Sequence, residues 1–261
     1  LPETKAYIAN VTDSSQPGGE GAVINVSAVN AIYRKIAEMN LAGNIIHCVS
    51  HFAGIRLRVD GATSYVNKLY DLAATNHYLQ VEATKQPILD ETGIKFDGSN
   101  DCLISDFGYN YTQPVTIISK LFTTAYPPSG DVVAMLKNTA PLVGEDTDGS
   151  RAVYYGLCIG DGNYGYFLVG SSGEYSTRKT ITTDISGLMS NKVSIFTYVK
   201  SSPFFYVNGS GDYSTSNGSS LKKGVNVTAF GTPKFSGSVQ AFAVFNKVLS
   251  QSEIVAFSKV L

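Results

Sequence analysis

One stretch decides the fold expected for this chain: Gly93-Ile94-Lys95-Phe96-Asp97-Gly98-Ser99-Asn100-Asp101-Cys102-Leu103. Apolar and polar residues alternate at its start, which predicts a strand, and an apolar strand resumes at Leu103. Between the two strands, Gly98 permits a positive φ. The side chains of Asp97, Asn100 and Asp101 can hydrogen-bond to their own backbone. The stretch therefore predicts a tight strand–turn–strand corner.

The composition favours many short strands over a helical bundle. Only 16% of the 261 residues are charged, and Gly and Tyr are abundant, with 25 and 16 copies. A formal net charge of −1 gives no electrostatic basis for binding a polyanion. No apolar run approaches the ~20 residues that a membrane-spanning helix needs. We therefore expect neither nucleic-acid binding nor membrane insertion.

The three cysteines do not form a disulfide framework, because their number is odd and they lie far apart. Cys102 and Cys158 fall in apolar strand patterns, which predicts buried free thiols. His47-Cys48-Val49-Ser50-His51 has the residue types of a zinc site. It lacks a nearby fourth ligand, and its apolar neighbours favour packing over metal binding.

The first fifty residues differ from the rest. Ser27 is a plausible N-cap, and Gly43 supplies a stop. Apolar residues recur between them at helical spacing: Val29, Ile32, Tyr33, Ile36 and Met39. Residues 45–52 are expected to be a short apolar connector, and residues 55–59 alternate as a strand.

Beyond residue 64, turns and strands alternate closely. Strands are predicted at 115–122, 132–136, 153–159, 164–169, 193–199 and 204–207, and a late strand spans residues 239–245. Ser250 and Glu253 fit the capping box of a final helix, with Leu249 and Ile254 as its hydrophobic staple. Strands without intervening helices predict antiparallel pairing in two packed sheets.

Three segments carry a family resemblance. Residues 67–72 and 86–89 lead into the Asp97 corner, and residues 235–254 form a closing strand and helix. Together they resemble laminin-G-like, concanavalin A-like lectin domains. The resemblance implies a mainly β fold, a two-sheet antiparallel jelly-roll sandwich over residues 55–261 with a short C-terminal helix. Residues 1–54 would form an N-terminal segment with one amphipathic helix, for attachment or for packing onto the sandwich.

A second resemblance concerns the order of the predicted segments along the chain. A short N-terminal helix, an apolar connector and such a jelly roll are similar to bacteriophage tail, fibre or other virion-surface proteins. This implies a place on a virion surface. The alternative is a secreted or bacterial cell-surface protein.

Candidate ligand-binding residues gather in the predicted turns, where aromatic rings stand beside Asp and Asn. A sugar needs an aromatic face for its C–H side and polar groups for its hydroxyls. The candidates are Tyr109, Asn110, Tyr111, Asp161, Asn163, Tyr164 and Tyr175.

No cofactor is required by the sequence, although calcium is one candidate. Laminin-G-like domains often hold calcium on a sandwich edge through Asp side chains. The resemblance implies Asp146, Asp148 and Asp161 for this role, and solvated turns are the alternative for the same residues.

The sequence predicts that the chain is not an enzyme. The acidic cluster at 145–149 lacks the spacing of paired catalytic carboxylates on one strand face, and no Ser–His–Asp arrangement stands out. We expect a virion-surface module that binds a host glycan or surface receptor. The alternatives are a structural virion protein, whose sandwich binds other virion proteins or further copies of itself, and a bacterial adhesin domain.

Overall fold

The computed structural model describes residues 1–12, 22–73, 77–97, 99–103, 105, 107–110, 114–123, 131–137, 154–160, 164–171, 174–180, 192–199, 205–208, 210–212, 224–227 and 236–261. Its helices are α1 (Pro2–Thr12), α2 (Val26–Glu38), the short 3-10 helix η1 (Ala83–Lys85) and α4 (Gln251–Ser258). Its strands are β1 (Ile45–Ser50), β2 (Ile55–Asp60), β3 (Thr63–Leu69), β4 (Tyr78–Leu79), β5 (Ile88–Asp90), β6 (Gly93–Asp97), β7 (Phe107–Asn110), β8 (Thr116–Thr123), β9 (Asp131–Lys137), β10 (Tyr154–Gly160), β11 (Tyr164–Ser171), β12 (Glu174–Thr180), β13 (Lys192–Val199), β14 (Phe205–Val207), β15 (Ser210–Asp212), β16 (Gly224–Val227) and β17 (Ser236–Phe245).

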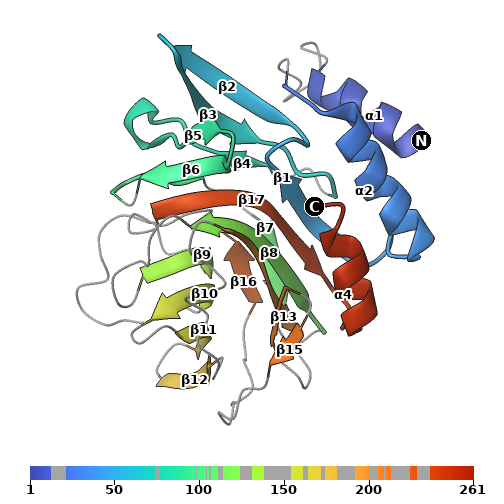
Figure 1. Cartoon of the computed structure of the whole chain (residues 1–261), viewed down its shortest axis with the longest axis vertical. Helices are drawn as coiled ribbons and strands as arrows, with labels where there is room; N and C mark the ends of the chain where they lie inside the picture. Colours follow the sequence, from blue (N-terminus) through green and yellow to red (C-terminus); the bar gives the residue numbers. More distant parts are fainter. Residues whose placement is uncertain are drawn as a thin grey trace.

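The fold is mainly β and antiparallel, as the sequence predicts. One large sheet has the order β15-β14-β13-β8-β17-β6-β5-β3-β2, with β1 beside β17 and β4 beside β3. The strands β12-β11-β10-β9 form a second sheet, and β16 pairs with β7. Figure 1 shows the large sheet curling into a half-barrel, with α1, α2 and α4 along one side of the molecule and β9–β12 along the opposite side.

Strand β17 is the centre of the large sheet. One of its edges pairs with β8, and its other edge pairs first with β6 and then with β1. The expectation that residues 45–52 are a connector is therefore wrong, because residues 45–50 are a strand. Since β1 finds its partner about 200 residues along the chain, no local pattern revealed it.

The helices cover one face of the large sheet. Helix α2 buries Val29, Ile32 and Ile36 against the sheet. Phe257 of α4 stands edge-on to Phe245 of β17, with ring centroids 5.0 Å apart and an interplanar angle of 89°. The predicted amphipathic face of residues 27–39 is thus confirmed, and it faces the sheet.

The ends of α2 differ from the prediction. The N-cap is Asn25, whose side chain accepts a hydrogen bond from Ala28 N, and not Ser27. The turn after the helix uses Asn40 at φ +52°, a left-handed conformation that Asn tolerates, and not Gly43. Helix α1 was not expected at all, although Pro2 at its start and the buried Tyr7 and Val11 fit helical positions.

Two local hydrogen-bonding predictions are confirmed, although the strand expected to resume at Leu103 begins at Phe107 instead. In α4, the Ser250 side chain accepts from Glu253 N, and the Glu253 carboxylate accepts from Ser250 N at 2.7 Å. In the corner after β6, Asp97 Oδ1 accepts from the backbone N of Ser99 at 2.7 Å, and Asp101 Oδ2 accepts from Asp97 N at 3.0 Å. Both motifs use neighbouring residues only, so sequence alone specifies them.

Candidate functional site

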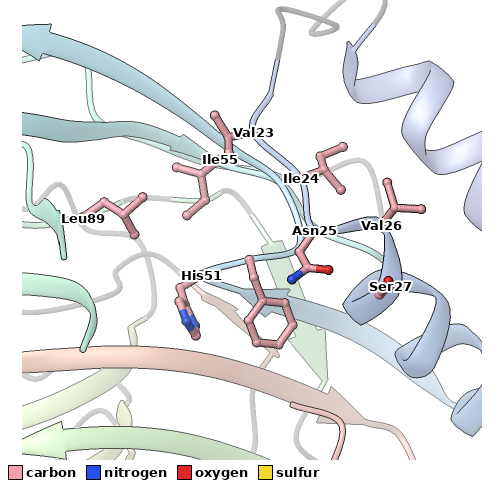
Figure 2. Close-up of a pocket in the computed structure, with 9 residues that line it drawn as sticks. Val23, Ile24, Asn25, Val26, Ser27, His51, Ile55 and Leu89 are labelled. Atoms are coloured by element: carbon pink, nitrogen blue, oxygen red, sulfur yellow. The ribbon is translucent and has the colours of Figure 1, made fainter. Parts of the chain in front are cut away.

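A pocket of about 500 Å³ opens between the segment before α2, the turn from β1 to β2, and strand β5 (Figure 2). We call it the His51 pocket. It is lined by Val23, Ile24, Asn25, Val26, Ser27, His51, Phe52, Ile55 and Leu89. Its volume lies within the ~300–1,000 Å³ of typical ligand pockets.

Backbone hydrogen bonds fix one wall of this pocket. Val23 N donates to Ile55 O at 2.8 Å, and Ile55 N donates to Val23 O at 3.1 Å. Asn25 N donates to Phe52 O at 2.8 Å. The segment before α2 is therefore held against β2 and the β1–β2 turn, and the wall is formed without a ligand.

The ring of His51 is held in one orientation. Its backbone N donates to Gln240 O at 2.8 Å, and its Nδ1 lies 3.0 Å from the same oxygen. Because a carbonyl oxygen only accepts, Nδ1 carries the proton in this bond, which leaves Nε2 of the neutral ring as an acceptor. Burial lowers the pKa of His51, with a smaller lowering by Lys120, while the bond to Gln240 opposes the shift. The neutral ring is thus the form present at pH 7.

Asn25 supplies a second polar group. Its Oδ1 accepts from Ala28 N at 3.1 Å and so caps α2. Figure 2 shows the amide nitrogen of Asn25 on the side of His51 and the amide oxygen on the side of Ser27. The nitrogen is a donor available to a ligand, while the oxygen is used in the fold.

The remaining walls are apolar. Val23 and Val26 are 59% and 49% exposed, which is high for valine. The ring of Phe52 is half-buried and stands edge-on to His51, with centroids 4.8 Å apart. Among the described residues that line the pocket, none is Asp, Glu, Lys or Arg. The arrangement is an apolar surface with a few oriented hydrogen-bonding groups, the general character of a small-molecule site.

The ligand residues predicted from sequence lie elsewhere. Tyr109 and Asn110 are in strand β7, where they pair with Val225 and Gly224, and not in a loop. Tyr164 begins β11, and Tyr175 is the second residue of β12 rather than part of a loop. The other predicted residues, Tyr111, Asp146, Asp148, Asp161 and Asn163, are outside the described residues.

The strand register separates two of these candidates. Tyr164 pairs with Gly160 at one end of β11, whereas the Ser171–Glu174 pair, next to Tyr175, lies at its other end. Seven residues of strand span roughly 23 Å at ~3.3 Å per residue. Tyr164 and Tyr175 therefore do not share one monosaccharide-sized site, and the ligand role of each stays a prediction.

A buried polar cluster that the sequence did not reveal joins His47 of β1 to Asp71. Nδ1 of His47 is 2.7 Å from Oδ2 of Asp71, and both side chains are fully buried. Asp71 Oδ1 accepts from Cys48 N at 2.8 Å and from Ala73 N at 3.0 Å. The cluster ties β1 to the chain after β3. Since His47 faces Asp71 and His51 faces Gln240, the two histidines serve separate networks.

The prediction of a buried free thiol is confirmed for Cys102. Cys48 and Cys102 are free and buried. Burial raises the pKa of the Cys48 thiol well above its usual value, so this thiol is un-ionised at neutral pH. Cys158 lies in β10, and its side chain is outside the described residues.

Within the described part of the chain, no helix combines the length and apolar character needed to cross a membrane.

Comparison with known proteins gives a likeness of fold. No protein-family model matches the chain, and no curated protein matches it in sequence. Trypanosoma rangeli sialidase in complex with 2,3-difluorosialic acid, a covalent intermediate, superposes with a TM-score of 0.54 at 13% identity, over 90% of this chain and 39% of the sialidase. The same sialidase in complex with sialic acid gives 0.53 at 14% identity, over 90% and 38%. The binding domain of Paraclostridial Mosquitocidal Protein 1 gives a TM-score of 0.49 at 15% identity, over 84% of this chain and 53% of that domain.

These comparisons correct one expectation. The sequence predicts that the chain is not an enzyme, and this prediction is contradicted because solved structures that share its fold include sialidases. The chain spans about two fifths of the sialidase length. At 13–14% identity, what is shared is the fold.

Proposed function

We propose that the chain is a carbohydrate-binding module and that the His51 pocket is its binding site. The observation that carries this proposal is the combination, in one preformed pocket, of exposed apolar side chains with an oriented acceptor on His51 and an oriented donor on Asn25. Sugars present an apolar C–H face and hydroxyl groups that both donate and accept. Such a pocket complements both features.

The likeness of fold to sugar-bound structures supports the proposal. The sialidase structures that resemble this chain hold sialic acid or its difluoro derivative. We further propose that the sheets form a lectin-type jelly roll of the laminin-G-like kind, as the sequence resemblance implies. The setting we propose is a virion surface, where many copies would raise a weak single-site affinity through avidity.

Binding to a glycan array tests the proposal. The purified chain, coupled in many copies to a fluorescent bead, is expected to label a defined subset of glycans. Phe52→Leu is expected to weaken that labelling, because it removes the ring from the pocket while nearly conserving volume. Leu79→Ala, at an exposed position of β4, serves as the control and is expected to leave labelling unchanged.

Two results would count against the proposal. The first is a chain that labels no glycan even in multivalent form. The second is glycan labelling that is equally strong with Phe52→Leu, which would place the binding site outside the His51 pocket. Binding only to other virion components would favour the structural alternative.

A further inference from the structure

We propose that the His51 pocket selects an uncharged sugar ring and discriminates against acidic sugars such as sialic acid. This inference rests on the proposed function, and it separates the chain from the sialidases that share its fold.

The charge of the pocket is the first argument. A carboxylate that leaves water needs a cationic partner or several donors to offset its lost hydration. The described lining residues include no Lys or Arg. Lys120 influences the pKa of His51 through space, but it is not part of the pocket wall. An acidic sugar would therefore lose hydration without a matching ion pair.

The polarity of the two fixed groups is the second argument. Nε2 of His51 can only accept, because the ring proton is held on Nδ1 by Gln240 O. The Asn25 amide nitrogen can only donate, and its orientation is set because Oδ1 caps α2. Sugar hydroxyl groups both donate and accept, so a hydroxyl can donate to Nε2 and another can accept from the Asn25 nitrogen. An ionised carboxylate has no hydrogen to donate, so Nε2 would face it lone pair to lone pair.

The apolar wall is the third argument. Val23 and Val26 expose 59% and 49% of their surface in the free protein. Covering them with the C–H face of a ring removes apolar surface from water, which favours binding. This contribution needs no charge on the ligand. Together, the three features favour a neutral pyranose as the ligand.

The test uses small probes and variants that keep the fold. The probes are methyl glycosides of glucose, mannose, galactose, N-acetylglucosamine and N-acetylneuraminic acid, observed by saturation-transfer NMR and titration calorimetry at pH 7.5. Asn25→Asp retains the helix cap, because an Asp oxygen accepts from Ala28 N, but replaces the amide donor with a negative charge. His51→Asn retains a donor toward Gln240 O but removes Nε2. Ser252→Asp adds the same charge to the first turn of α4 and is the matched control.

At least one neutral glycoside is expected to bind more tightly than the neuraminic acid glycoside. Both pocket variants are expected to weaken that binding roughly tenfold or more, as expected for the loss of one buried hydrogen bond. Ser252→Asp is expected to bind as the parent does. Neuraminic acid binding that is at least as tight, and that the pocket variants weaken, would overturn the inference while leaving the proposed function intact. Neutral binding that neither variant changes would overturn the inference as well. If none of the glycosides binds, the inference fails, and labelling of the glycan array by the multivalent chain decides the proposed function.

Discussion

His47 and Asp71 form a fully buried pair, with Nδ1 of the imidazole 2.7 Å from Oδ2 of the carboxylate. The second carboxylate oxygen of Asp71 accepts from two backbone N–H groups, those of Cys48 and Ala73. A single side chain thus connects β1 to the segment between β3 and β4.

Asp71→Ala is expected to lower the free energy of unfolding by roughly 3–5 kcal/mol, because it leaves the buried His47, the buried N–H group of Cys48 and the partly buried N–H group of Ala73 without their carboxylate. Asp71→Asn keeps one oxygen for the N–H groups and is expected to cost clearly less. Urea unfolding at pH 7 measures both. Equal losses for the two variants would contradict the role assigned to the N–H contacts.

His77 is expected to make the fold sensitive to acid. Its Nδ1 accepts from Asp71 N at 3.2 Å, and protonation removes that lone pair. Burial and, after it, Lys68 lower the pKa of His77 from 6.5 to about 4. The unfolded chain therefore takes up this proton at a higher pH than the folded chain does. The stabilisation of the fold by neutral His77 is complete above pH 6.5 and is lost as the pH falls toward 4.

His77→Asn provides the comparison, because its amide oxygen can accept from Asp71 N and does not titrate. The stability difference between parent and His77→Asn, measured by urea unfolding at several pH values between 4 and 7.5, is expected to change in favour of the variant as the pH falls. A difference that is independent of pH would show that His77 does not titrate with folding.

Asp101 is expected to make stability depend on pH in the opposite direction to His77. Burial, and then the neighbouring Asp97 carboxylate, raise the pKa of Asp101 from 3.8 to about 6. The folded chain therefore holds this proton more strongly, and stability falls as the pH rises from 3.8 to 6. Asp101→Asn keeps an acceptor for Asp97 N and is expected to be more stable than the parent at pH 7, by on the order of 1 kcal/mol after allowance for solvent screening. Thermal unfolding of both proteins at pH 4 and pH 7 measures this gain, which should vanish at the lower pH.

Gly54 is expected to tolerate no side chain. Its φ is +149°, and a Cβ would lie 2.6 Å from the Tyr7 hydroxyl and 3.2 Å from Tyr70 Cβ. That hydroxyl donates to Ala53 O at 2.8 Å, so the clash would also disturb the hydrogen bond that holds α1 against the β1–β2 turn. Gly54→Ala should cost about 2 kcal/mol or more in urea unfolding. Gly43→Ala is the control, since a Cβ there meets nothing within 4 Å, and a similar loss at both positions would refute the packing argument.

The sequence predicts those parts of the fold that neighbouring residues specify. The capping box of α4, the hydrogen bonds of the Asp97 corner and the predicted strands at 153–159 and 164–169 are each formed within one short stretch, and each is confirmed. Strand β1 was missed because its partner, β17, is distant in sequence. The N-cap of α2 was misplaced by two residues because both Asn25 and Ser27 are good caps, and only the bond from Ala28 N distinguishes them.

The candidate site could not be predicted for a related reason. The His51 pocket combines the segment before α2, the β1–β2 turn and Leu89 of β5, which come together only when the sheet forms. His51 was considered as a metal ligand because of its neighbours in sequence. The contact that fixes its role is with Gln240, 189 residues away.

The pairing of β1 with β17 has a consequence for biosynthesis. The side chains of Asn44 and Asn246 share a hydrogen bond of 3.0 Å across 202 residues of chain. A ribosome must therefore translate nearly the whole described sequence before the first strand obtains its neighbour. Until then the buried residues of α2 lack Ala241, Ala243 and Phe245 of β17, which belong to the same apolar cluster. The nascent chain should therefore depend on chaperones for longer than a protein built from local hairpins.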